Sequence, residues 1–167
     1  MSSTYASGGV YIADNSFVLN SDNFTFDFWA RFTNYSTGAC LIDYRIVDTT
    51  NSALLIQQES TALTFYRNYV SGTPFLNLTG FFNVTDTWMR ITIVRNLDTL
   101  LVYRNGVNMS TTAITGFTFS TSNRLTFAAR FANHATGDYG VNGAVDDFKF
   151  AKSPVFLANF DPNYDIA

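Results

Sequence analysis

Phenylalanine alternates with polar residues through residues 24–32, and this pattern constrains the fold more than any other stretch of the sequence. The even positions hold Phe24, Phe26, Phe28, Ala30 and Phe32, and the odd positions hold Thr25, Asp27, Trp29 and Arg31. Successive side chains of a β-strand point to opposite faces, so the pattern predicts a strand with one apolar face. A phenylalanine ring left in water costs about 2 kcal/mol, and the row must therefore face a core. Trp29 lies on the other face, where it is either covered by a loop or exposed as a stacking platform.

A pair of hairpins is predicted between residues 86 and 107. Two runs rich in β-branched and aromatic residues, 88–95 and 100–104, are joined by a short turn and followed by Asn105–Gly106, a dipeptide typical of tight β-turns. Arg90 and Thr92 alternate with two isoleucines, so we expect them on a solvent-exposed face. A lone hairpin is unstable in water, and these strands therefore require further strands and a second sheet.

Further strands are expected along the whole chain, at residues 10–12, 40–45, 53–58, 63–66, 75–78, 117–119, 124–131 and 144–151. The composition agrees, with 17 Phe and 9 Tyr but one Glu and two Lys, because aromatic and β-branched residues favour pleated strands. About a dozen short strands without a crossover helix are typical of an antiparallel sandwich. We therefore predict an all-β fold and a single domain over residues 1–167, since this length suits one core.

The charge and the N-terminal sequence limit the partners and the location of the protein. The net charge is -3 and there is no basic cluster, so we expect no nucleic acid partner. No apolar run approaches the roughly 18 residues of a membrane span, so no membrane insertion is expected. The first residues lack the basic and apolar regions of a signal peptide, which predicts synthesis in the cytoplasm without an export signal. Cys40, the single cysteine, is expected to be a small buried residue.

Three phrases of the sequence follow one another in the order and spacing of a known family. They are Gly8–Tyr11 with Asn23–Trp29, then Trp88–Arg95 with Leu101–Gly106, and finally Gly143–Phe150. They resemble laminin G-like domains of the concanavalin A-like lectin and glucanase superfamily. Residues 151–162 are similar to the ending of such modules in bacteriophage tail and virion proteins, although Ser153–Pro154 replaces their usual Gly-Val. The resemblance implies a jelly-roll β-sandwich of two curved antiparallel sheets that binds a glycan or a protein, often with calcium.

On this resemblance we expect a non-catalytic surface module of a virion, either a capsid decoration or a tail or fibre component, that attaches through glycan recognition. Its partners would be other virion proteins, copies of itself or host-surface glycan, and its location would be the virion surface. One alternative is a purely structural decoration or cement protein that binds the shell and no sugar. Another is a glycoside hydrolase or lyase, since glucanases share this architecture.

Few residues could support catalysis. A retaining glycosidase needs two carboxylates about 5 Å apart, but Glu59 is the only glutamate and no pair of aspartates is spaced along one strand face. His134, the only histidine, lies in a polar loop, so a catalytic triad is not indicated. One histidine and one cysteine also cannot complete a tetrahedral zinc site. We therefore expect no enzyme activity.

Two loops could form a glycan-binding rim, because a sugar stacks on an exposed ring while its hydroxyl groups pair with polar side chains. The candidate residues are Tyr66, Arg67, Asn68, Tyr69 and Phe75 in the first loop and His134, Asp138 and Tyr139 in the second. The alternative is that these rings pack under the loops or against a neighbouring subunit.

Calcium is the one cofactor for which ligands are abundant, because it prefers carboxylate, amide and carbonyl oxygens and the chain has 12 Asp and 16 Asn. The candidate calcium ligands are Asp43, Asp48, Asp138 and Asp146. Asp146 shares strand parity with Phe148 and Phe150, so at that position we expect a half-buried structural role in preference to calcium ligation.

Overall fold

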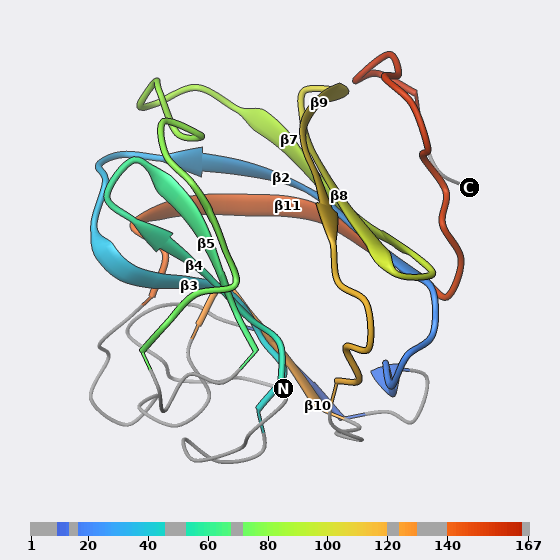
Figure 1. The fold of residues 1–167 in the computed structure, drawn as a ribbon. Helices are drawn as coiled ribbons and strands as arrows, with labels where there is room; N and C mark the ends of the chain where they lie inside the picture. Colours follow the sequence, from blue (N-terminus) through green and yellow to red (C-terminus); the bar gives the residue numbers. More distant parts are fainter. Residues whose placement is uncertain are drawn as a thin grey trace.

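The computed structural model describes residues 10–13, 17–45, 53–67, 72–119, 124–129 and 140–164. Their eleven strands form two antiparallel sheets that enclose one main core. Figure 1 shows the two sheets as facing layers. The six-stranded sheet has the order β1 (Val10–Ala13), β10 (Arg124–Phe127), β3 (Thr37–Asp43), β4 (Leu55–Glu59), β5 (Ala62–Tyr66) and β6 (Leu76–Leu78). The five-stranded sheet has the order β11 (Gly143–Ala151), β2 (Phe24–Phe32), β7 (Met89–Asn96), β8 (Thr99–Arg104) and β9 (Val107–Ala113). The predicted all-β antiparallel sandwich is confirmed. Within the described ranges the chain forms no helix with the length and hydropathy of a membrane span.

The main core is built around the phenylalanine row of β2. The four phenylalanines within Phe24–Phe32 are completely buried, which confirms the prediction from their spacing. Phe28 meets Phe127 of the opposite sheet edge-on, with ring centroids 5.0 Å apart. Cys40 of β3 is also fully buried, as expected.

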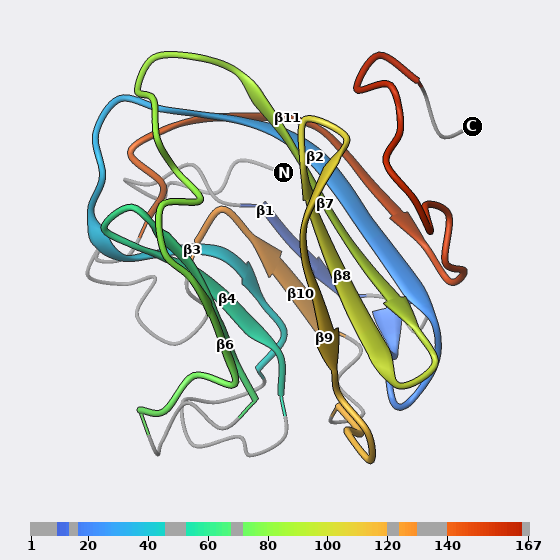
Figure 2. The ribbon, with the colours of Figure 1, turned by 45° about the horizontal axis from the view of Figure 1, so that its top comes forward.

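The two predicted hairpins are present. β7 and β8 are joined at Leu97–Asp98, and β8 and β9 are joined at Asn105–Gly106. Asn105 and Gly106 have φ angles of 50° and 76°, the left-handed values that a tight hairpin turn needs. The turns place β7, β8 and β9 side by side in the five-stranded sheet, with β9 at its edge (Figure 2).

One predicted strand is absent from the structure and another is shorter than predicted. Residues 117–119 form no strand, because Gly116 turns the chain at a φ of 73° and Phe119 then donates its backbone N–H to the Asn20 carbonyl. The Phe119 ring is nevertheless buried in the main core. β10 ends at Phe127, earlier than predicted, since the φ of 60° at Ala128 departs from strand conformation.

A β-bulge in β11 reverses the predicted orientation of Asp146. The pairing of β11 with β2 changes register between Asp146 and Lys149, and Asp147 has a φ of 52°. Because strand side chains alternate between faces, the extra residue moves Asp146 to the face opposite Phe148 and Phe150. Asp146 is exposed there, so the half-buried role expected for it is wrong.

Tyr44 should make the stability of the fold fall in alkaline solution. Its ring is fully buried, and its hydroxyl oxygen accepts a hydrogen bond from the Leu19 N–H at 3.0 Å. Burial raises the pKa of Tyr44 from 10.0 to about 12, against the smaller opposing effect of that hydrogen bond. The folded state therefore favours the neutral phenol more than the unfolded state does. This stabilisation is complete below pH 10 and is lost as the pH rises through 12.

Guanidinium unfolding across that pH range tests the expectation. The free energy of unfolding of the parent protein should fall by roughly 2–3 kcal/mol more than that of Tyr44→Phe, which has no group to ionise at this position. Burial also raises the pKa values of Tyr35 and Tyr103. Both residues remain in the two proteins, so their contributions to the alkaline loss of stability cancel in the comparison. Equal alkaline losses in the two proteins would contradict the assignment to Tyr44.

Candidate functional site

The C-terminal segment 154–164, called the tail below, covers part of the outer face of the five-stranded sheet. It is the red segment beside β8 and β11 in Figure 1. Arg90 and Thr92 on that face are only 3% and 0% exposed. The prediction that both face water is therefore wrong, because a segment distant in sequence packs over them.

Arg90 of β7 joins the sheet to the tail. Its guanidinium donates hydrogen bonds to both carboxylate oxygens of Asp27, at 2.9 and 2.7 Å. It also donates to the Pro162 carbonyl at 2.7 Å and to the Tyr164 carbonyl. The Thr92 hydroxyl donates to Asp27 as well. The buried charges are thus paired and hydrogen-bonded, and they hold the last residues of the tail in one position.

Hydrogen bonds to its backbone groups hold the tail on the sheet at two further points. The Thr25 hydroxyl donates to the Ser153 carbonyl at 2.7 Å and accepts from the Val155 N–H at 3.0 Å. Farther along, the Phe160 N–H donates to the Gly106 carbonyl at 2.9 Å. These contacts fix the path of the tail along the sheet.

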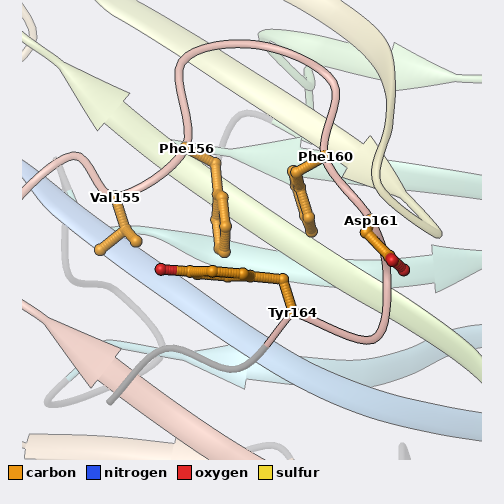
Figure 3. Close-up of a pocket in the computed structure, with 5 residues that line it drawn as sticks. All are labelled: Val155, Phe156, Phe160, Asp161 and Tyr164. Atoms are coloured by element: carbon orange, nitrogen blue, oxygen red, sulfur yellow. The ribbon is translucent and has the colours of Figure 1, made fainter.

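The aromatic residues of the tail are stacked beside Arg90. Phe156 and Phe160 lie nearly parallel, with ring centroids 3.8 Å apart. The Arg90 Cζ atom lies 5.5 and 5.3 Å from these two centroids, within range of a cation–π interaction. Tyr164 meets Phe156 edge-on at 6.1 Å. Figure 3 shows the Tyr164 ring lying across the edge of the Phe156 ring.

Two hollows adjoin Tyr164, and together they are called the Tyr164 site below. The first has a volume of about 330 Å³ and is lined by Val155, Phe156, Phe160, Asp161 and Tyr164 (Figure 3). The second has a volume of about 280 Å³ and is lined by Trp29, Arg90, Asp147, Pro162, Asn163 and Tyr164. Tyr164 is 61% exposed, so its ring is accessible to a ligand. Trp29 is half-buried. Its ring is therefore neither fully covered nor fully exposed, because the tail adjoins the ring and covers only part of it.

A turn holds the polar groups of the Tyr164 site. The Asp161 carboxylate accepts hydrogen bonds from the backbone N–H and the side-chain amide of Asn163, at 2.9 and 3.1 Å. The Tyr164 N–H donates to the Asp161 carbonyl at 2.9 Å. Asp161 thereby orients a carboxylate and an amide beside an exposed ring. Such a group can stack on the apolar face of a ring-shaped ligand and pair with its hydroxyl groups.

The described residues of the first predicted rim are packed against the protein. Tyr66 is only 8% exposed and clusters with Cys40 and Leu55 on the six-stranded sheet. The Arg67 Cζ atom lies 4.6 Å from the Phe117 ring centroid. The expectation of an exposed stacking ring at Tyr66 is therefore wrong, because the sheet surface beneath it is apolar.

Phe75, the last residue predicted for this rim, is half-buried. Its ring centroid lies 6.1 Å from that of Phe65 and 5.2 Å from that of Phe117, which packs it against the main core. The structure therefore gives Phe75 a packing role instead of a place on a rim. The other predicted glycan-binding residues lie outside the described residues; they are Asn68, Tyr69, His134, Asp138 and Tyr139.

The described calcium candidates do not assemble into a site. Both carboxylate oxygens of Asp43 accept hydrogen bonds from the Arg45 guanidinium, at 2.8 and 2.6 Å, so Asp43 does not fit a calcium ligand. Asp146 is exposed and accepts a hydrogen bond from the neighbouring Asp147 N–H. Asp48 and Asp138 lie outside the described residues. Among the residues that the structure does describe, no three His, Cys, Asp or Glu side chains are grouped closely enough to hold a metal ion.

Sequence reasoning missed the tail as a candidate site, although two signals were present. Phe156, Phe160 and Tyr164 recur at intervals of four residues near the C-terminus. Asp27 and Arg90 place opposite charges on two strands that are otherwise rich in apolar residues. Charged side chains are seldom buried unless they are paired. Their position on such strands indicated an ion pair between them, buried by another segment of the chain.

Comparisons with known proteins agree with the fold. A family model described as the concanavalin A-like lectin/glucanases superfamily, Laminin_G_3, matches residues 4–155. No curated protein matches the chain. The matched region extends from before β1 to the start of the tail.

Similar solved structures include binding domains of botulinum neurotoxins. The binding domain of serotype G has a TM-score of 0.66 and 16% identity, covering 90% of this chain and 38% of its own. A structure concerned with the dependence of type C on two ganglioside molecules has a TM-score of 0.62 and 16% identity, covering 89% and 37%. The binding domain of neurotoxin DC in complex with rat synaptotagmin II has a TM-score of 0.62 and 17% identity, covering 89% and 37%. The chain thus spans less than two fifths of these structures, and at this identity they show the fold alone.

Proposed function

The chain belongs to the concanavalin A-like lectin/glucanases superfamily, and from that premise we propose that it is a non-catalytic module that binds glycan at the Tyr164 site. The observation that carries this proposal is an exposed tyrosine between two hollows, with carboxylate and amide groups beside it. Fold alone does not fix a function, so the chemistry of this site has to support it.

The groups of the Tyr164 site match the chemistry of a sugar. Tyr164 offers a flat apolar surface for the C–H face of a pyranose ring. Asp161 and Asn163 line separate hollows. The Asp161 carboxylate can accept hydrogen bonds from hydroxyl groups, and the Asn163 carboxamide can accept or donate them. Because Arg90 and the Asp161 turn hold these residues before any ligand arrives, little conformational entropy is lost on binding.

The solved structures support a binding role of this kind. The type C neurotoxin is described as depending on ganglioside, which is a glycolipid, and neurotoxin DC is described in complex with a protein. We extend this to the present chain as part of the proposal, with glycan as the preferred partner because of the chemistry at Tyr164.

The proposed module is not an enzyme. Glu59, the only glutamate, ends β4 in the sheet that does not carry the tail. Asp27, which lies beneath the tail, is buried and paired with Arg90. Hydrolysis by a retaining mechanism would need two carboxylates that act together across the bond to be cleaved. Release of reducing ends from a polysaccharide would contradict this part of the proposal.

We place this module on a virion surface, where it would attach the particle to host glycan. This part rests on the likeness of residues 151–162 to endings found in phage tail and virion modules. Those residues overlap the tail that builds the Tyr164 site. Neighbouring genes that encode capsid or tail proteins would support the virion role, and neighbouring genes of unrelated metabolism would count against it.

A purely structural decoration or cement role is the second candidate, and one observation favours it. Val107, Met109 and Leu157 are 53%, 37% and 56% exposed on β9 and the tail. The Asn159 carboxamide oxygen accepts the Asn108 N–H at 2.8 Å, which places the start of β9 against the tail. Exposed apolar side chains on β9 and the tail would suit contact with another copy of the chain or with the shell.

A glycan array separates the two candidate functions. We expect the parent protein to bind, and Tyr164→Ala to weaken that binding about tenfold or more, because one stacking ring is lost. Tyr164→Phe should retain most of the binding. Leu157→Ala is the matched control, since Leu157 is 56% exposed in the same tail and lines neither hollow.

Two outcomes would count against glycan binding at this site. Equal binding by the parent protein and Tyr164→Ala would move the site elsewhere on the molecule. The structural role would be favoured if the parent protein binds no glycan on the array and forms oligomers in solution that Leu157→Ala weakens.

A further inference from the structure

The outer face of the five-stranded sheet carries a strip of three residues, Trp29, Arg31 and Trp88, which begins in the second hollow of the Tyr164 site at Trp29. Trp29 and Arg31 lie two residues apart on β2, so their side chains share one face. Trp88 precedes β7, and the pairing of Ala30 with Met89 places it level with Arg31. Trp88 is 40% exposed, and the Arg31 Cζ atom lies 5.8 Å from its ring centroid.

Arg31 has no hydrogen-bond acceptor and no carboxylate partner among the described residues. Its Nε atom is buried and unpaired, whereas the rest of the side chain is half-buried. Asp146 lies opposite Trp29, two pairs away from Arg31 in the register, and forms no ion pair with Arg31 in the described structure. A buried N–H group without an acceptor is costly, so this one calls for an explanation.

The other described arginines are used differently. Arg45 and Arg90 pair with aspartates, and Arg95 and Arg104 donate to backbone carbonyls. Arg67 also has an unpaired Nε, but it adjoins residues outside the described ranges. Arg31 therefore stands out as a half-buried arginine on an otherwise well-described surface, with no acceptor among the described residues.

We propose that Arg31 and Trp88 form a subsite for a sugar that carries a carboxylate. The guanidinium presents donors in a planar fork that matches the two oxygens of a carboxylate. Trp88 offers a stacking surface for the ring that bears this carboxylate. The exposed carboxylate of Asp146 beside the strip disfavours a dense polyanion.

This subsite extends the proposed function and depends on it, since it is one part of the same glycan-binding face. Two residues along a strand span roughly 6.6 Å, which sets Arg31 about one sugar unit from Trp29 in the second hollow. An oligosaccharide with a neutral unit at Tyr164 could therefore place an acidic unit at Arg31. The Tyr164 site would supply general affinity, and Arg31 would supply specificity for acidic glycans.

Titration of the full chain with glucuronate tests the subsite without knowledge of the natural glycan. We expect the Arg31 Nε–H resonance to shift saturably with glucuronate and not with glucose. Arg31→Gln should weaken glucuronate binding about tenfold or more, because the charge-assisted hydrogen bonds are lost. Arg31→Lys should retain part of the affinity, since the charge remains without the fork. Lys152→Gln removes an exposed positive charge elsewhere and should leave the binding unchanged.

The outcomes separate this proposal from that of the Tyr164 site. Tyr164→Ala should leave the glucuronate-induced shift at Arg31 intact. If the parent protein binds nothing on the glycan array but still shows this shift, only the proposal for the Tyr164 site is contradicted. The subsite is overturned if glucuronate causes no shift at Arg31, if glucose causes an equal shift, or if Arg31→Gln binds glucuronate as well as the parent protein does. Tighter binding of glucose sulfate than of glucuronate would overturn the assignment to a carboxylate.

Discussion

Replacement of Arg90 by methionine is expected to lower the free energy of unfolding by about 3–5 kcal/mol. Methionine fills much of the same space but leaves the Asp27 carboxylate buried without its ion-pair partner. It also removes the hydrogen bonds to the Pro162 and Tyr164 carbonyls, so the tail should detach. Guanidinium unfolding measures the first effect, and limited proteolysis near the C-terminus measures the second.

Two further variants make the Arg90 result specific. Lys152→Met also removes a positive charge, but the Lys152 and Asp22 side chains are 44% and 53% exposed and 3.6 Å apart, so stability should change by less than about 0.5 kcal/mol. The double variant with Asp27→Leu should lose less stability than the sum of the two single variants, because no unpaired charge remains. A loss below about 1 kcal/mol for Arg90→Met would mean that the buried pair does not hold the sheet and tail together.

Gly106→Ala is expected to displace the tail and abolish binding at the Tyr164 site while the β-sandwich remains folded. A Cβ atom at this position would lie 1.9 Å from the Phe160 carbonyl oxygen, which belongs to the backbone. The φ of 76° adds about 1–2 kcal/mol of strain for alanine. The tail backbone must therefore move, and the hydrogen bond between the Phe160 N–H and the Gly106 carbonyl should break.

Gly116→Ala is the matched control for this prediction. Gly116 has a φ of 73°, but no atom lies within 4 Å of the position of its added Cβ. It should therefore show only the backbone strain, with intact glycan binding and intact resistance of the C-terminus to protease. If both alanine variants lose the same stability and both keep their binding, contact between the tail and the second hairpin turn is not needed to form the site.

Features that depend only on neighbouring residues in the chain were predictable from the sequence. The spacing of the phenylalanines in β2 predicted its core face, and Asn105–Gly106 predicted the turn into β9. Both are local properties, since strand parity and turn conformation are set within a few residues. The family resemblance drew on the same local phrases, and it agreed with the fold.

The alternation of side chains between strand faces gave a wrong prediction in β11, where the strand contains one extra residue. The bulge at Asp147 turned Asp146 outward, although the pattern of Phe148 and Phe150 placed it inward. A single residue in a left-handed conformation is enough to exchange the two faces of a strand. Nothing in the alternation itself marks that residue, because Asp147 is only one of several polar residues at which the bulge could form.

The sequence by itself determined that the chain forms an antiparallel β-sandwich with a phenylalanine-rich core, because the alternation of apolar and polar side chains is a local pattern of neighbouring residues. Only the tertiary structure decided which outer surfaces are exposed. Arg90 and Thr92 are buried by residues more than sixty positions later in the chain, and Tyr66 is buried against Cys40 and Leu55. Such covering depends on where distant segments pack, which no local pattern records, and for that reason the candidate site lies on the tail and not on the predicted loops.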